Sequence, residues 1–214
     1  MAPPDPPHIW FAVHYPYLAR VGVIPPDSAA QSIQDYVDRD PRLMPLGFRW
    51  WLEQGDSATL KRAVEILTSH PESRHVFRTP NRRVLDEARG HLALLRGDST
   101  EALALLTAWR PCPRGMWCSP ADYTTAQLLA ADGRLQRADA LSGWAAFGSW
   151  DGALTMRQQA LLRGRINELL DRLDVAAWSY QVVLDYWAEG DPEVQPWVEE
   201  ARAGLARLGL EPER

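Results

Sequence analysis

Long apolar runs are absent from this sequence of 214 residues. No stretch approaches the roughly 18 uninterrupted apolar residues that a membrane-spanning helix needs, so we expect no membrane insertion of this chain. The N-terminus, Met-Ala-Pro-Pro-Asp-Pro-Pro, lacks the basic start and the apolar core of a secretion signal. The expected location is therefore the cytoplasm, or an extracytoplasmic compartment if the chain is part of a membrane-anchored parent.

Positive charge is scarce. Lys61 is the only lysine, and 23 Lys and Arg residues stand against 28 Asp and Glu, a net charge of −5 at pH 7. A nucleic-acid binder needs a basic surface that displaces counterions from phosphates, so direct contact with nucleic acid is not expected. A regulator that acts next to nucleic acid through another protein is left as an alternative.

Enzyme motifs are absent as well. There is no Gly-x-Ser-x-Gly, no His-Glu-x-x-His and no phosphate-binding glycine loop. We interpret His70 and His75, which flank a turn, and His91, within a helix, as solvated or packing side chains. The ten tryptophans, Trp178 among them, are interpreted mostly as packing in the core and between repeats. The sequence therefore predicts a protein that is not an enzyme and has no cofactor or metal.

Cysteine is rare: Cys112 and Cys118 lie six residues apart in a proline-rich segment. A disulfide between them would close a small loop and contribute about 2 kcal/mol to stability. A metal would need two more ligands, and no His or Cys lies nearby in the sequence. We interpret the two cysteines as a structural pair and possible disulfide, reduced or oxidised. A thiol- or metal-dependent activity centred on them is an alternative.

The composition fits a folded domain behind an N-terminal tail. Residues are 46% apolar and 24% charged, which is ordinary for a globular protein. Prolines make 1–26 a tail of uncertain structure, part of which fits a short strand and a buried helix equally well. Residues 27–210 are predicted to form the helical domain. Its first helix, 27–37, has Asp27 or Ser28 as the expected N-cap.

Four helical hairpins follow the first helix. Gly55, Gly97 and Gly133 each stand where a helix ends in a left-handed residue, and Asp171 takes that place in the fourth turn. Asp98 is expected to cap the next helix. The predicted helix pairs are 43–53 with 57–69, 82–96 with 99–109, 121–132 with 135–147, and 153–170 with 174–188, and Leu169 is among the residues expected to pack inside the fourth.

A last helix is predicted to begin near Asp191-Pro192, with Pro196 delaying its regular part by a turn. Val198, Ala201 and Leu205 recur at helical spacing and form an apolar stripe. A single amphipathic helix after the last hairpin is what an open-ended helical array needs to cover its terminal apolar face. This segment is the expected C-terminal capping helix.

Small residues recur in pairs twelve positions apart, at intervals of 36 and 38 residues. Twelve residues across a short turn bring facing positions of two antiparallel helices together, so small side chains there allow close approach. A period in the mid-thirties is typical of a solenoid of helical hairpins. The pairs are Gly90 and Ala102, Ala126 and Ala138, and Gly164 and Ala176.

With these small residues, the turn glycines and the bulky Leu106 and Tyr180 that follow, the repeats resemble tetratricopeptide (TPR) repeats. They are divergent copies, because none has the early tryptophan of the family and Asp171 departs at its turn. Residues 176–187 with the segment from Asp191 resemble the closing part of such arrays in large bacterial proteins. The resemblance implies an all-α, TPR-like superhelical solenoid with a C-terminal capping helix.

The resemblance also implies a function. Arrays of this kind are scaffolds or sensors in bacterial signalling and often follow a serine/threonine kinase or a regulatory output domain, so the expected partner is a protein or peptide. The first helix of each hairpin would line a concave groove that binds the partner. The groove residues implied in this chain are Glu87, His91, Leu94, Tyr123, Gln127, Ala130, Leu161, Arg165 and Glu168.

Overall fold

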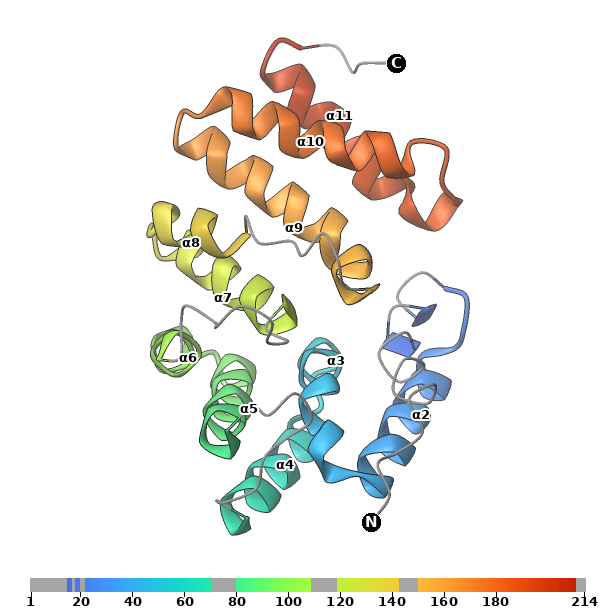
Figure 1. Ribbon diagram of the computed structural model, residues 1–214, viewed down its shortest axis with the longest axis vertical. Coiled ribbons are helices and arrows are strands. Elements are labelled where there is room, and N and C mark those ends of the chain that lie inside the picture. Colours follow the sequence, from blue (N-terminus) through green and yellow to red (C-terminus); the bar gives the residue numbers. More distant parts are fainter. Residues whose placement is uncertain are drawn as a thin grey trace. The chain divides into compact units, whose positions relative to one another are not determined.

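The computed structural model describes residues 15, 16, 18, 19, 22–70, 80–108, 119–142 and 150–210. By its internal contacts the chain divides into two compact units, 1–121 and 122–214, and each is described by itself. Every secondary-structure element among the described residues is a helix, and neighbouring helices in the sequence pack together as hairpin-like pairs (Figure 1). The chain is therefore all-α. No described helix has the length and apolar character needed to cross a membrane.

The first unit contains the helices α2 to α6 and the 3-10 helix η1, and residues 15, 16, 18 and 19 are helical as well. The α4–α5 and α5–α6 pairs make its most extensive helix contacts, and α3 also packs on both α4 and α5. One buried cluster, which includes Ile33, Phe48, Trp51, Leu60 and Leu92, runs through these helices. The elements are α2 (Pro26–Arg39), η1 (Pro41–Leu46), α3 (Phe48–Glu53), α4 (Ser57–Ser69), α5 (Asn81–Leu95) and α6 (Ser99–Thr107).

The second unit continues the same arrangement. Helix α9 packs against α8, α10 and α11, and α10 packs against α11. Its buried cluster comes from α9, α10 and α11 and includes Leu161, Tyr180, Val183, Val198 and Leu205. The elements are α7 (Ser119–Ala131, which begins three residues before the unit does), α8 (Leu135–Ser142), α9 (Trp150–Leu169), α10 (Leu173–Trp187), η3 (Pro192–Val194) and α11 (Gln195–Arg207).

The four hairpin turns share one hydrogen-bond pattern. Gly55, Gly97 and Gly133 have φ of 69°, 79° and 75°, as predicted, and the next N–H bonds the carbonyl five residues back, at 2.8–2.9 Å. In the fourth turn Asp171 adopts φ 57° and Arg172 N–H bonds Asn167 O at 2.9 Å. An aspartate tolerates this left-handed conformation better than most residues, so the turn persists without glycine.

Two predicted helix starts are wrong, and prolines explain both. The first helix begins at Pro26 with Pro25 as its N-cap, so neither Asp27 nor Ser28 caps it. The predicted helix 43–53 is a 3-10 helix, Pro41–Leu46, followed by α3, because Pro45 has no N–H for a regular helical ladder. The predicted delay at Pro196 is confirmed, since η3 precedes α11.

Candidate functional site

Tyr180 of α10 belongs to the buried cluster of the second unit. Its side chain is 0% exposed and lies between two glycines on different helices. A Cβ built on Gly164 of α9 would lie 2.5 Å from ring atom Cε1, and one on Gly204 of α11 would lie 2.5 Å from Cε2 on the opposite edge. Carbon atoms do not approach so closely, so α10 packs against both neighbours only because each carries glycine there.

The prediction that Gly90 and Gly164 allow close packing is supported, with a different neighbour. The nearest atoms belong to the bulky residue four positions beyond the facing alanine: Leu106 Cγ at 2.8 Å for Gly90, and Tyr180 for Gly164. In the third hairpin the corresponding residues are Ala126 and the small, buried Ser142. Where the first helix has glycine, the residue facing it on the second helix is therefore large, and where the first helix has alanine, that residue is small.

The Tyr180 hydroxyl takes part in a charged hydrogen-bond network that joins α9 to α11. It donates a hydrogen bond to Glu168 Oε1, and Arg207 binds the same carboxylate through Nη2 (2.7 Å) and Nε (3.1 Å). The bonds from Arg207 and Tyr180 lower the pKa of Glu168 against the opposing effect of its burial. Burial, and then the bond to Glu168, raise the pKa of Tyr180.

These shifts predict how stability depends on pH. Because the folded protein lowers the pKa of Glu168, the network stabilises it above about pH 4.5, the ordinary glutamate pKa, and this stabilisation is lost as the pH falls through the lowered value. Thermal melts from pH 6 to pH 3 should show Glu168→Gln about 1 kcal/mol less stable than wild type near neutrality and converging with it in acid. Glu199→Gln, which removes an exposed charge from α11, should show the same pH dependence as the wild type. If the stability difference between wild type and Glu168→Gln were the same at pH 3 as at pH 6, the ionised Glu168 carboxylate would not be the cause of it.

Two more contacts join α9 to α11. Arg165 forms an ion pair with Glu200, and the guanidinium of Arg157 lies 4.0 Å from the centre of the Trp197 ring. Together with the pair of Glu168 and Arg207, these contacts involve increasing residue numbers on both helices, so α9 and α11 run in the same direction. Helix α11 thus covers a face of α9 through three contacts spread along both helices.

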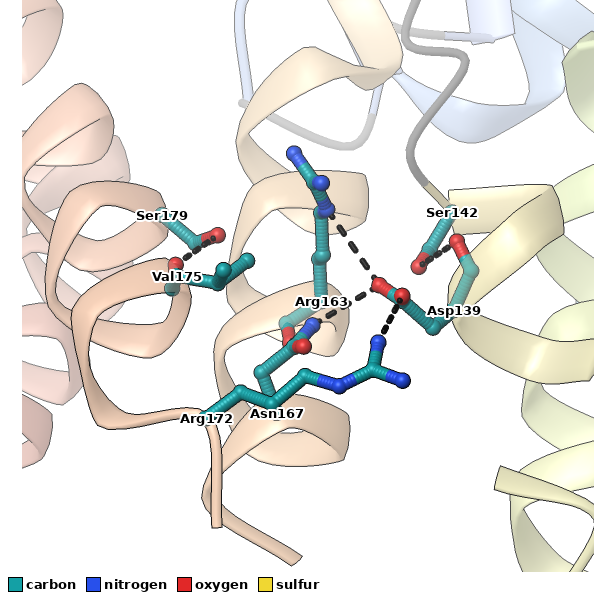
Figure 2. Close-up of polar contacts among 7 residues, drawn as sticks. All are labelled: Asp139, Ser142, Arg163, Asn167, Arg172, Val175 and Ser179. Atoms are coloured by element: carbon teal, nitrogen blue, oxygen red, sulfur yellow. Dashed lines mark hydrogen bonds and ion pairs between the residues drawn. The ribbon is translucent and has the colours of Figure 1, made fainter. Parts of the chain in front are cut away.

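Asp139 joins α8 to the fourth hairpin (Figure 2). Its carboxylate accepts hydrogen bonds from Asn167 Nδ2 (2.8 Å), Arg172 Nη1 (2.9 Å) and Arg163 Nε (3.4 Å). Asn167 is fully buried and also donates to Arg163 O, while the Asp139 side chain is 16% exposed. This cluster was not predicted from the sequence, because its members are up to 33 residues apart and no short motif contains them.

The residues implied to line a binding groove lie in different environments. Tyr123 and Gln127 are one turn apart on α7, where Gln127 Nε2 donates to the Tyr123 hydroxyl at 3.0 Å and Gln127 is exposed. His91 and Leu161 are only 1% and 3% exposed, and the His91 ring packs 6.0 Å from the Phe48 ring. Glu87, Leu94 and Ala130 are half-buried, whereas Arg165 and Glu168 form the ion pairs with α11.

Several other predicted features are placed only in part. Cys112, Cys118 and His75 lie outside the described residues. Within the described ranges, no cluster of three or more His, Cys, Asp or Glu side chains could hold a metal ion. Leu169, expected inside the fourth hairpin, is 68% exposed, and Trp178, interpreted as packing, is 51% exposed.

The chain therefore belongs to the class of all-α proteins built from sequential helix pairs. Comparisons with known protein families, with curated proteins and with solved structures find no match.

Proposed function

We propose that the protein is a TPR-like interaction scaffold or sensor that binds a segment of another protein, in a bacterial signalling setting. The observation that carries the proposal is the repeated hairpin: a glycine or alanine on the first helix, a left-handed turn residue, and a matched large or small residue on the second. Such a unit is specified by packing alone, and its solvent-facing positions remain available for a partner. Helix α11 then acts as the capping helix.

Within the second unit the proposed binding face centres on α7. Gln127 is exposed and Tyr123 is half-buried, so the pair offers a phenol ring and an amide on a rigid helix. On α9 the corresponding residues Arg165 and Glu168 already pair with α11. Pre-formed side chains on a helix bind with little loss of conformational entropy, which suits recognition of a peptide or helix. A kinase or regulatory output domain is the partner class that we propose.

The test is capture of proteins from a lysate of the source organism on the immobilised chain. A Tyr123→Ala, Gln127→Ala variant should lose a protein that the wild type retains, with about tenfold weaker binding when that protein is purified. Gln31→Ala, Asp35→Ala on α2 is the matched control, since this exposed pair has the same spacing and also shares a side-chain hydrogen bond (2.7 Å).

The control variant should bind as the wild type does, and circular dichroism should show equal helix content in all three proteins. Gln127→Lys, a single change at an exposed position, is a second variant in case the loss of the Tyr123 ring unfolds the unit. Equal retention by every variant would place the binding site away from α7.

A further inference from the structure

The outer surface of α10 carries aromatic side chains that the core does not use. Trp178 is 51% exposed and Tyr186 is 61% exposed, and both lie in a helix whose other side packs against α9 and α11. Exposed large aromatic residues on one helix face are typical of an interaction surface. Together with Asp174, Asp185 and Glu189, which are also exposed, they make up what we call the acidic-aromatic face.

The acids of this face form no ion pair with a described basic side chain of the protein. Residues 122–214 contain nine arginines and no lysine against fifteen Asp and Glu. Arg163 and Arg172 bind the carboxylate of Asp139. Among the described side chains, none that is basic pairs with Asp174, Asp185 or Glu189, and Asp185 accepts only from the neutral Gln181 (2.7 Å).

The protein itself contains an example of the recognition that we infer. The guanidinium of Arg163 lies 5.5 Å from the centre of the Trp178 ring. A planar guanidinium stacks on aromatic rings and is held more firmly when a carboxylate lies nearby. The Trp178 ring therefore already accepts one arginine from α9, and its exposed half is open to a second.

We propose that the acidic-aromatic face of α10 is a docking surface for an arginine-rich segment of a partner protein. Acids lie at helical spacing from both rings: Asp174 is one turn before Trp178, Asp185 is two turns after it, and Glu189 follows Tyr186 by three residues. Arginine satisfies both parts of such a pair, with its plane on the ring and its charge against the carboxylate. This face shares no residue with the one proposed on α7, so binding at either face can be tested without the other.

The spacing of the two rings defines the segment. Trp178 and Tyr186 are eight residues apart on one helix, which corresponds to about 12 Å along its axis. An extended chain covers that distance in about four residues. The segment that fits this face has arginines about four residues apart along an extended backbone.

The test is direct binding of a fluorescently labelled peptide of about twelve residues, with arginine at every fourth position and serine elsewhere. At low salt the wild-type chain should bind it with a Kd on the order of tens of micromolar, and a glutamate version should not bind. Trp178→Ala, Tyr186→Ala should weaken binding about tenfold. Asp174→Asn, Asp185→Asn should have an effect of similar size, and added salt should weaken the wild-type complex.

The matched control is Glu193→Gln, Glu199→Gln, which also removes two negative charges, here from exposed positions of η3 and α11. It should change the Kd less than twofold. An equal loss in the control would mean that the peptide responds only to net charge, and would overturn the proposal. Wild-type binding of the arginine peptide no tighter than that of the glutamate peptide would also overturn it. The Asp174 and Asp185 variant preserves the test if removal of the rings unfolds the unit.

Discussion

Gly164→Ala is expected to destabilise the protein, although alanine is the better helix former. In an exposed helix this change would add about 1 kcal/mol of stability. Here the new Cβ would lie 2.5 Å from the Tyr180 ring, and Gly204 touches the ring's other edge, so the ring has no room to move. Overpacking of this kind costs about 3 kcal/mol, which exceeds the gain in helix propensity, and we expect a net loss of about 2 kcal/mol in urea unfolding.

A double-mutant cycle identifies the cause. Tyr180→Ser alone should cost about 4 kcal/mol, because it empties a fully buried site. In that background Gly164→Ala should become stabilising, since its Cβ then enters free space and produces the small–small combination of Ala126 and Ser142. If Gly164→Ala is equally destabilising with and without the tyrosine ring, the close contact is not the reason that glycine is needed there.

Asp139→Ala is expected to cost about 3 kcal/mol. The carboxylate accepts from three side chains of the fourth hairpin, and its removal leaves the buried Asn167 amide and the Arg163 guanidinium without this acceptor. The unfolding of the second unit, followed by chemical denaturation, measures the loss. Arg163 and Arg172 variants should show coupling to Asp139 in the same assay.

Asp132→Ala is the control for this prediction. Asp132 also pairs with an arginine, Arg134, at 2.6 Å, but both side chains are about half exposed. An exposed pair of this kind contributes little, so the change should stay within about 0.5 kcal/mol. Equal effects of the two substitutions would show that Asp139 does not join α8 to the fourth hairpin.

Local chemistry made the hairpins predictable. The turns at Gly55, Gly97 and Gly133 need only a residue that accepts positive φ, and Asp98 needs only a neighbouring N–H, which it finds at Glu101 (2.9 Å). The residues that form each of these turns and caps lie within five positions of one another, so they can be recognised from the sequence alone. The predicted helix 43–53 is wrong in its first half, where Pro45 lacks the N–H that a regular helix needs and a 3-10 helix forms.

The interior of the second unit was less predictable because it depends on distant residues. Gly164 could be assigned to close packing, but nothing in the sequence linked Gly204 to Tyr180 across 24 residues. The exposure of Trp178 also could not be predicted, because the position of a tryptophan in a helix sequence does not by itself tell whether its ring is buried or exposed. His91, which the repeat resemblance placed at a binding position, is buried beside Phe48.

The most direct test of the proposed interaction function is photo-crosslinking in the source cells. A photoreactive phenylalanine analogue at position 127, on the exposed side of α7, should form a covalent adduct with one specific protein. The same analogue at position 31, exposed on α2, should not. We expect an adduct at position 127 alone; no adduct at either position, or the same adducts at both, would contradict a partner-binding face on α7.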